Sequence, residues 1–532
     1  MTRPAPRPLP WLVATFLGLY GLFAGGHLYT GDAATVQATA RSVLSGQGFA
    51  IDFDRAYGGA YGPDGKFYGQ YGLGAVLSGL VPAAAGELLA GLLPGGPEST
   101  RLLRQLPAAL WNIPFAAAAV GLVFACAGLL GMRPTTALAV ACSAGVGTML
   151  WPYAARDFTE PQVACFLLLA YHELLRLERS GREGCAVSAG AALGWALLTK
   201  VYVVVLAPLF VFEAWRRGGG RPLRTAVLFS TPLGVAAAAI AWYNLHRFGS
   251  PFVTGYASQV QNTHIPFWIG AFGLLLSAGK SVFLYNPPLL AAATGAPAFH
   301  RRAAGDSRFI WLLAAVHVAF FSIQQNWDGD WAWGPRYLLP AIPFTMLAAG
   351  ALLESGARTL LWRLTLAAGL AVQFLGLAVD PNDWVRYLEA HKRELGDYLP
   401  GYPTKRYVPL HQHHWNPDLS PLRGHWFLLR STLYPASAGS FVLHSSAEEW
   451  NDEKGHVLLP LVDLGPAGKH AGSLDFWFAS LPRLMEPGQA AAPLSAMGIG
   501  CLALVCLGLP RLARSWRLLA RAEATADAEA RT

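Results

Sequence analysis

Long apolar runs alternate with short polar segments along most of this chain. Runs of about 18 or more residues with few charges recur, and each is long enough for a helix to cross the hydrocarbon core of a bilayer. The segments on either side of Lys200 are shorter and favour a tight hairpin. The pattern predicts about 12 transmembrane helices, over residues 11–27, 107–130, 135–151, 163–175, 186–198, 201–215, 225–243, 269–298, 309–323, 337–353, 360–379 and 494–509.

One further apolar run, residues 73–93, fits a span by composition but contains many Gly and Ala residues, Pro82 and Glu87. If it crossed the membrane, the arginine-rich loops after it would all lie outside, against the usual excess of Lys and Arg in cytoplasmic loops. If it is interfacial or re-entrant, those loops and both termini lie inside. We therefore expect residues 73–93 to be an interfacial or re-entrant segment that follows a polar first outer loop, residues 28–72.

Changes in composition divide the chain into three parts. Residues 1–379 are expected to form a transmembrane catalytic domain, and residues 494–532 a last transmembrane helix with a cytoplasmic tail. Residues 380–493 contain more charge, His, Trp and Pro, and no run long enough to span. They predict an extracytoplasmic soluble domain of mixed α/β structure, in which the alternation of residues 441–444 hints at a strand. The expected fold class is an all-α polytopic membrane protein with this outer region near its C-terminus.

The overall composition supports a membrane protein and excludes an ordinary soluble one. Only 14% of the 532 residues are charged, against about one-quarter in an average soluble domain. The net charge of +8 comes largely from arginines between apolar runs, so it indicates topology and not nucleic-acid binding. The six cysteines show neither metal spacing nor a disulfide framework.

On this topology, the outer loops collect cations, carboxylates and aromatic residues. Ionisable groups at membrane depth are costly and point to function by default. Lys200, Lys280 and Arg336 are three such cations, and they suit an anionic group such as phosphate. Asp32 could remove a proton from an incoming hydroxyl, and the Trp and Tyr residues could supply faces for sugar rings. The alternatives are that Asp32 is a solvated loop residue or helix N-cap, and that the aromatic residues are interface anchors.

Three further patterns have simpler alternatives. Asp328-Gly329-Asp330 looks like the metal-binding motif of soluble sugar-nucleotide transferases, but such a pair is more often a loop turn. The His cluster at residues 411–414 matches no standard metal spacing and fits a surface cluster better. Arg156 and Asp157 are neighbours and could pair with each other. A divalent cation is therefore a candidate cofactor whose ligands the spacing leaves unknown.

Several short motifs follow one another across about the first two-thirds of the chain. They are Thr30-Gly31-Asp32 with Ala40-Arg41-Ser42; residues 61–68 (YGPDGKFY) with Tyr71-Gly72; Phe158-Thr159-Glu160-Pro161; Leu197-Leu198-Thr199-Lys200; Tyr243-Asn244 with residues 247–251 (RFGSP) and Thr254-Gly255-Tyr256; Leu276-Ser277 with Lys280 and Tyr285-Asn286-Pro287; and residues 333–340 (WGPRYLLP). Together they resemble the bacterial membrane glycosyltransferases of the GT-C fold, the protein-mannosyltransferase-like or glycosyltransferase-39-like group. Where many relatives have a second acidic residue after the first Asp, this chain has Ala33 and Ala34.

The resemblance implies a hexosyl- or pentosyltransferase of the bacterial cytoplasmic membrane, with its site on the extracytoplasmic face. It would transfer a sugar from a polyprenyl-phosphate carrier to a cell-envelope glycan, lipid or protein, with inversion. Asp32 would be the base, and the donor phosphate would lie near Arg336, Lys200 or Lys280. Candidates for a second carboxylate or for acceptor binding are Asp157, Glu160, Arg247, Tyr256 and Tyr337.

Three rival functions would use similar residues. A transporter or flippase of lipid-linked saccharides needs cations and aromatic residues but no proton-accepting Asp32. A non-catalytic envelope scaffold would tolerate alanine at Asp32, Lys200 and Arg336. A lipid-linked-glycan ligase or polymerase would differ in the size of its donor.

Overall fold

The structure is a computed structural model, and it describes residues 8–52, 58–93, 95–256, 265–356, 359–391, 412–434, 441–444, 456–459, 474–485 and 491–529. Within these residues, seven helical stretches are long and apolar enough to cross a membrane, and three shorter apolar helices accompany them. Regular structure is helical apart from two short hairpins. The chain is a helical polytopic membrane protein, as the apolar runs predict.

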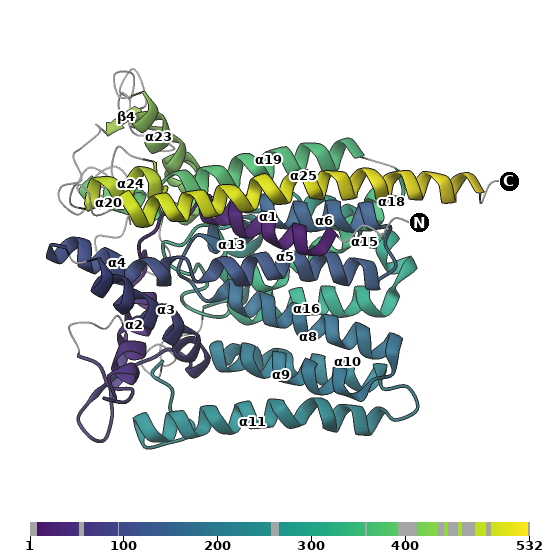
Figure 1. The fold of residues 1–532 in the computed structure, drawn as a ribbon, viewed down its shortest axis with the longest axis horizontal. Helices are drawn as coiled ribbons and strands as arrows, with labels where there is room; N and C mark the ends of the chain where they lie inside the picture. The colour runs from purple at the N-terminus through teal and green to yellow at the C-terminus, as the bar shows by residue number, and fades with distance from the viewer. Residues whose placement is uncertain are drawn as a thin grey trace.

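The long helices run side by side along the longest axis of the molecule (Figure 1). Both chain ends lie at the same end of this bundle, which we call the terminal end; the opposite end is the loop end (Figure 1). The long helices are α1 (Pro8–Leu22), α5 (Asn112–Leu129), α8 (Glu160–Ser180), α9 (Glu183–Thr199), α11 (Pro222–Phe248), α16 (Ala304–Ser322), α19 (Thr359–Ala378) and α25 (Ala491–Glu529).

The core of the bundle lies around α5, α6 (Pro134–Gly147) and α8, which are rich in buried Ala, Leu and Val. By contrast, α11 and α25 leave large apolar side chains exposed, among them Leu223, Val235, Trp242 and Ile499. Exposed apolar faces on long helices are expected where a helix faces lipid. The core and the outer helices therefore differ as a membrane bundle requires.

The elements from α2 (Gly31–Leu44) to α4 (Pro97–Ala109) gather at the loop end (Figure 1). The residues predicted as the first outer loop, 28–72, contain α2 and an antiparallel hairpin of β1 (Gly59–Tyr61) and β2 (Phe67–Gly69), and α3 (Leu73–Leu92) and α4 follow them. The long apolar helix α3 corresponds to the run predicted to be interfacial or re-entrant, and it is also apolar enough to span. Its place relative to a membrane stays a prediction.

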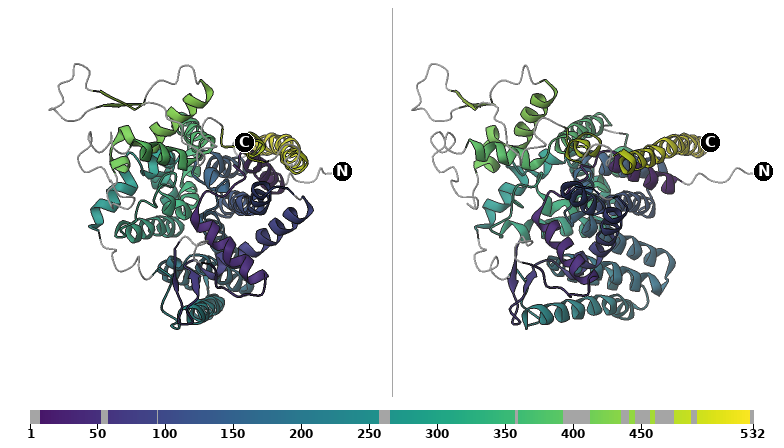
Figure 2. Two further views of the ribbon diagram at one scale, coloured as in Figure 1. Left: turned by 90° about the vertical axis from the view of Figure 1, so that its left-hand side faces the viewer. Right: turned by 60° about the vertical axis from the view of Figure 1, so that its left-hand side comes forward.

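The C-terminal region lies at the same end of the bundle as α2–α4 (Figures 1 and 2). Its described residues form mostly helices together with one hairpin, and β3 falls on the residues whose alternation suggests a strand. Helix α25 then returns along α1 to the terminal end (Figure 1). The elements are α20 (Pro381–Ala390), α22 (Gln412–Trp415), η4 (Pro417–Leu419), α23 (Pro421–Leu433), β3 (Phe441–His444), β4 (His456–Leu459) and α24 (Trp477–Leu484).

Several of the predicted spans are broken into shorter helices, among them 135–151 and 201–215, which divide at residues 148–149 and 206–207. Residues 269–298 divide into α13 (Phe267–Leu276), α14 (Val282–Tyr285) and α15 (Leu289–Arg302), and residues 337–353 into η3 (Arg336–Ala341), α17 (Ile342–Met346) and α18 (Ala348–Glu354). Prolines follow α14 and lie within η3; proline lacks an N–H donor and disfavours helical geometry in the residue before it. Lys280 lies in the turn between α13 and α14, and Arg336 is the first residue of η3.

The chain also turns sharply at Lys200, where the hairpin is predicted. Helix α9 ends at Thr199, Lys200 has an extended backbone, and η2 (Val201–Leu206) leads into α10 (Ala207–Arg217). A similar change of direction follows α6, where the short helix α7 (Leu150–Ala154) precedes the segment that carries Arg156 and Asp157. These turns bring charged side chains from several helices to the loop end.

Candidate active site

Asp32 occupies the first turn of α2 at the loop end. The Thr30 hydroxyl accepts a hydrogen bond from the Ala33 N–H at 3.1 Å and is the N-cap of this helix, so the alternative that Asp32 is the cap is wrong. A carboxylate in the first turn is favoured by the helix dipole. Its Oδ1 accepts a hydrogen bond of 2.7 Å from the Tyr71 hydroxyl, and 26% of the side chain is exposed. Asp32 is thus fixed in orientation yet accessible.

Asp32 lines two cavities at once. The lysine cavity, of about 40 Å³, also contains Lys200 and Asp157 in its wall, together with small and polar residues of α2 and α3. The arginine cavity, of about 140 Å³, is lined by Asp32 and Arg336 together with aromatic residues that include Trp331. The Asp32 carboxylate therefore lines both a cavity that contains Lys200 and a cavity that contains Arg156 and Arg336.

Arg336 begins η3 and is buried without a close carboxylate. Its guanidinium lies over the rings of Phe158 at 4.5 Å and Tyr337 at 4.9 Å. The nearest carboxylate oxygens are those of Asp32, 3.8 Å from Nη1, and Asp330, 3.9 Å from Nη2, both beyond hydrogen-bond distance. Nε has no hydrogen-bond partner among the described residues. Because an incompletely paired buried charge is costly, this geometry suits an added anion.

Lys200 provides the second cation. Its Nζ lies 3.4 Å from Glu160 Oε1, and the side chain is 18% exposed in the lysine cavity. Glu160 begins α8 and is almost fully buried, and its Oε2 has no hydrogen-bond partner in the described part of the chain. Lys200 therefore contacts Glu160 over a long distance for a hydrogen bond, and it faces the lysine cavity, which Asp32 also lines.

Asp157 holds the segment that leads into Asp32. Its Oδ2 accepts hydrogen bonds from the backbone N–H groups of Tyr29 at 2.8 Å and Thr30 at 3.1 Å. Burial raises the pKa of Asp157 to about 6, although these N–H groups act in the opposite direction. Arg156 points elsewhere, toward Asp475 at 2.6 Å, so the proposed pair between Arg156 and Asp157 is wrong.

Lys280 lies outside both cavities. Its side chain is fully buried, and Nζ donates to the carbonyl oxygens of Asp330 and Ala332, both at 2.7 Å, and of Gly334 at 3.3 Å. These three bonds use every N–H of the ammonium group. Lys280 thus positions the loop that leads to Arg336, and its ammonium group does not face either cavity.

Arg247 also bonds to the surrounding structure, and it lines neither cavity. It donates to the carbonyl oxygen of Gly69 at 2.5 Å and to Asn244 Oδ1 at 3.0 Å, and its guanidinium lies 3.6 Å from the centre of the Tyr243 ring. These contacts fix the β1–β2 hairpin against α11. Arg247 therefore supports the scaffold beside the site, and its expected part in acceptor binding stays a prediction.

The two tyrosines among the expected residues lie behind the site. Tyr337 stacks on Phe321 with ring centres 4.5 Å apart, and its hydroxyl accepts a bond of 3.2 Å from Arg336. Tyr256 meets the Tyr71 ring edge to face at 6.4 Å. Tyr337 thus supports the guanidinium, and Tyr256 supports the hydroxyl that holds Asp32.

The aspartates of Asp328-Gly329-Asp330 have different partners. Asp328 Oδ1 accepts from the Asp330 N–H at 2.9 Å, and its Oδ2 lies 2.8 Å from His414 Nε2. Asp330 has a positive φ of 59° and turns toward Arg336. The motif is a tight turn, as the simpler alternative states. Of the His cluster, His411 and the side chains of residues 412 and 413 lie outside the described part; among described residues, no three His, Cys, Asp or Glu side chains form a metal-ligating group.

Sequence reasoning missed the contribution of the C-terminal region. Asn382 of α20 lines the arginine cavity, and Asp475 pairs with Arg156 beside it. Neither lies in a motif used for the resemblance. The sequence contains one signal: Asp475 is an acid between the apolar residues Leu474 and Phe476. If these apolar neighbours are buried, Asp475 is buried with them, and a buried acid nearly always has a partner.

The molecule is thus a helical membrane protein with a carboxylate between two cation-bearing cavities at its loop end. No family model and no curated protein matches the chain. Among solved structures, the chain is similar to ArnT from Cupriavidus metallidurans bound to undecaprenyl phosphate, with 14% identity, a TM-score of 0.43 and coverage of 96% of this chain and 76% of that one. The apo state of ArnT gives 15% identity, a TM-score of 0.39 and coverage of 73% and 79%. Neither substrate nor reaction follows from likeness at this level.

Proposed function

We propose that this protein is an integral membrane glycosyltransferase that moves a hexosyl or pentosyl group from a polyprenyl-phosphate donor to an extracytoplasmic acceptor, with inversion. The acceptor class is a hydroxyl of a cell-envelope glycan, lipid or protein. One observation supports the proposal above all: Asp32, held by Tyr71, lies between the two cavities and 3.8 Å from the incompletely paired Arg336.

Asp32 is suited to act as the general base. The bond from Tyr71 fixes one carboxylate oxygen, and the other faces the cavity side of Arg336. A base must lie within hydrogen-bond reach of the proton that it removes. A hydroxyl group in either cavity can reach Asp32, because its side chain lines both.

Arg336 and Lys200 are suited to hold the phosphate. An arginine remains protonated at all working pH values and can donate two parallel hydrogen bonds to phosphate oxygens. As the bond between the anomeric carbon and the phosphate oxygen breaks, negative charge grows on the leaving phosphate. Cations placed beforehand stabilise that charge more than they stabilise the ground state.

The proposed reaction is a single displacement. The acceptor oxygen attacks the anomeric carbon while Asp32 takes its proton, and the polyprenyl phosphate leaves with the electron pair of the broken bond. Inversion needs no covalent intermediate, so a second carboxylate nucleophile is not required. Asp157 then serves to hold the Asp32 segment, and Glu160 to balance the charge of Lys200.

We infer that the loop end faces away from the cytoplasm. Arginines are frequent at the helix ends beside the connections α8–α9, α10–α11 and α15–α16, which lie toward the terminal end. Ion pairs join Arg133 with Asp527 at 3.1 Å, and Arg302 with Glu354, so these helix ends meet near the end of α25. An excess of arginine marks the cytoplasmic side of membrane proteins.

The test is transfer by the purified full-length protein in lipid vesicles, offered a panel of polyprenyl-phosphate monosaccharides and a cell-envelope extract. Asp32→Asn should lower transfer by about 10²- to 10⁴-fold, the usual contribution of a general base. Asp64→Asn is the matched control: Asp64 belongs to the same outer loop, but it accepts a bond from Tyr68 and lines neither cavity.

A different result would support the transporter. In that case no donor yields a transferred sugar, and labelled lipid-linked sugar crosses the vesicle membrane equally well with wild type and Asp32→Asn. Equal transfer by wild type and Asp32→Asn would retain the enzyme but remove Asp32 as its base.

A further inference from the structure

The C-terminal region meets the segment before Asp32 through a buried charged cluster. Asp475 Oδ2 accepts hydrogen bonds from Arg156 Nη1 at 2.6 Å and from the Tyr29 hydroxyl at 2.9 Å, and its Oδ1 lies 3.1 Å from His27 Nε2. We call His27, Tyr29, Arg156 and Asp475 the Asp475 cluster. Three of the four residues come from the transmembrane part, and the acid comes from the far end of the chain.

The Asp475 cluster is tightly built. The side chains of Asp475 and Arg156 are 1% and 4% exposed, and the Arg156 guanidinium lies 3.9 Å from the centre of the Tyr29 ring. Burial alone would raise the pKa of Asp475, but Arg156 and His27 outweigh it and hold the pKa at about 2. A Cβ at Gly25 would lie 1.6 Å from the Tyr29 hydroxyl, so only glycine leaves space for this contact.

Backbone hydrogen bonds beside the Asp475 cluster also join the C-terminal region to the transmembrane part. The Asp475 N–H donates to the Ala378 carbonyl oxygen at 2.9 Å, and the Trp477 N–H to that of Ala24 at 2.8 Å. Asn382 donates its side-chain N–H to the Tyr29 carbonyl oxygen at 3.2 Å. The C-terminal region therefore holds the chain at Ala24 and at Tyr29, just before Asp32.

Tyr29 is thus held from two directions. Its N–H donates to Asp157 in the transmembrane part, while its hydroxyl and carbonyl oxygen bond to Asp475 and Asn382 in the C-terminal region. Tyr29 also lines the arginine cavity, three residues before Asp32. A shift of Tyr29 would move the start of α2 and, with it, the carboxylate.

We propose that Asp475 is a positioning residue for sugar transfer, which acts through the Tyr29 hydroxyl to hold Asp32 in the wall between the two cavities. The C-terminal region then completes the active site instead of only adjoining it. This inference rests on the proposed function, because it assigns the contact a role in that reaction.

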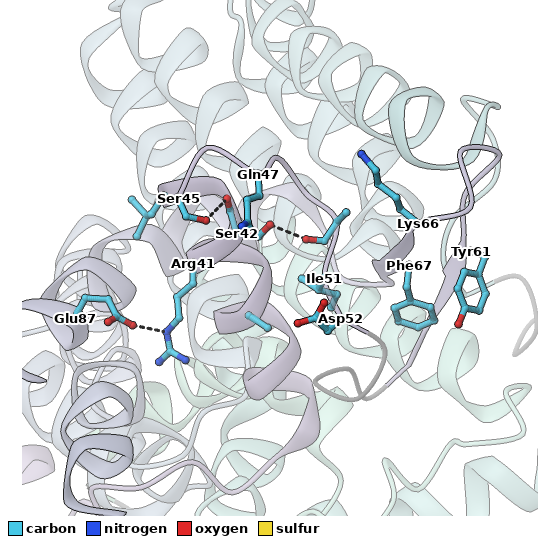
Figure 3. Close-up of a pocket in the computed structure, with 13 residues that line it drawn as sticks. Arg41, Ser42, Ser45, Gln47, Ile51, Asp52, Tyr61, Lys66, Phe67 and Glu87 are labelled. Carbon is cyan, nitrogen blue, oxygen red and sulfur yellow. Dashed lines mark hydrogen bonds and ion pairs between the residues drawn. The ribbon is translucent and has the colours of Figure 1, made fainter. Parts of the chain in front are cut away.

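A further hollow does not bear on this contact. It has a volume of about 880 Å³ and lies beside the C-terminal half of α2 between Arg41, Lys66 and Glu87 (Figure 3). Arg41 is paired there with Glu87 at 3.3 Å, and Ser42 bonds to a backbone carbonyl oxygen (Figure 3). Asp32 lies at the opposite end of α2 and does not line this hollow.

The first measurement is steady-state transfer by Tyr29→Phe and Asp475→Asn in vesicles, per folded molecule. Tyr29→Phe removes one hydroxyl and leaves the pair of Asp475 with Arg156 intact, so it tests the proposal even if Asp475→Asn fails to fold. We expect kcat to fall about tenfold in each, with KM for the lipid donor changed less than about twofold, because small misplacement of a reacting group is costly. The double variant should lose no more than the larger single loss, since both act through one contact.

The matched control is Asp418→Asn. Asp418 lies in the same C-terminal region and pairs with Arg423, and it lines neither cavity of the site. Its kcat should equal that of the wild type. Equal kcat per folded molecule in Tyr29→Phe and the wild type would overturn the proposal and leave Asp475 as a tie between two parts of the fold.

The second measurement does not depend on turnover. Amide hydrogen exchange of residues 23–34 should be faster in Tyr29→Phe and Asp475→Asn than in the wild type, and unchanged in Asp418→Asn. Unchanged exchange in both variants overturns the proposal, whatever their kcat. If the wild type transfers no sugar from any donor, the proposed function fails by itself, and exchange still decides whether Asp475 positions the segment.

Discussion

Two buried arginines at opposite ends of the bundle differ in how closely carboxylates approach their guanidinium groups. At the terminal end, Arg217 contacts Glu213 at 2.9 Å, and also Glu178 and Asp306, each with a separate nitrogen. At the loop end, Arg336 has no carboxylate oxygen nearer than 3.8 Å among the described residues, and its Nε has no hydrogen-bond partner. Burial alone does not distinguish the two, because both side chains are at most 7% exposed.

The difference separates an arginine that builds structure from one that, on the proposed function, meets a ligand. Arg217 joins α8, α10 and α16 through its three carboxylates, so the fold itself supplies its counter-charges. For Arg336 the fold supplies aromatic faces and distant acids, which stabilise a cation only in part. The missing counter-charge is the place that we assign to the donor phosphate.

The largest expected effect is on transfer by Arg336→Gln. Removing a cation that meets growing charge in the transition state should lower kcat by about 10²- to 10³-fold. The thermal midpoint should change little, because the nearest carboxylate oxygens, on Asp32 and Asp330, lie beyond hydrogen-bond distance of the guanidinium. Transfer assays and unfolding scans on the same preparation check both. A large loss of stability with unchanged kcat would place Arg336 beside Arg217 as a structural residue.

The next largest effect is expected for Arg217→Gln, which should lower stability and leave transfer unchanged. Breaking a buried ion pair by removing one partner costs about 3–5 kcal/mol, and here three carboxylates lose their common cation. Transfer per folded molecule should be unchanged, because the cluster lies at the other end of the bundle. Denaturation in detergent measures the first quantity. Arg221→Gln, whose exposed side chain pairs with Glu183 at 3.6 Å, should cost little.

The smallest effect concerns pH and a carboxylate at the loop end. Burial raises the pKa of Asp157 to about 6, so its charge is lost below that pH and its hold on Tyr29 and Thr30 weakens. We expect kcat to fall several-fold as the pH drops through about 6, and Asp157→Asn to lack this step. Stability has the opposite sign: the contribution of a raised carboxyl pKa is present in acid and lost as the pH rises through about 6.

The control for the pH profile is Asp64→Asn, which should keep the step. Asp64 is an exposed acid whose pKa is lowered by its bond from Tyr68, so it does not titrate near pH 6. A step that persists in Asp157→Asn would assign the titration to another group.

Hydropathy predicts the class of helical membrane protein, because a span must be long and apolar wherever it lies. It does not predict the individual spans as well: about 12 are expected, but seven described helical stretches are long and apolar enough to cross a membrane. Proline indicates a break only through its effect on neighbouring residues, whereas hydropathy alone predicts one helix over residues 269–298. In the structure, α13, α14 and α15 are separate helices. The same limit applies to charged side chains. The pattern places Lys280 near Arg336, but only the loop path decides that its ammonium meets carbonyl oxygens.

That loop path depends on contacts distant in sequence. Gly334 has a φ of +62°, and a Cβ there would lie 2.5 Å from Met149 Sδ. Chemistry alone could select Asp32 and Arg336 as candidates for one site, but it could not predict the distance between them. Asp475 could not be placed at all, because its partner His27 lies 448 residues earlier in the chain.

The same separation sets the order in which the protein can be made. During synthesis, the segment before Asp32 leaves the ribosome well before Asp475, which follows only after the helices between them. Until then, Arg156 lacks the acid that neutralises it, and Tyr29 lacks its hydroxyl partner. The helices that precede Asp475 therefore enter the membrane before the Asp475 cluster can form.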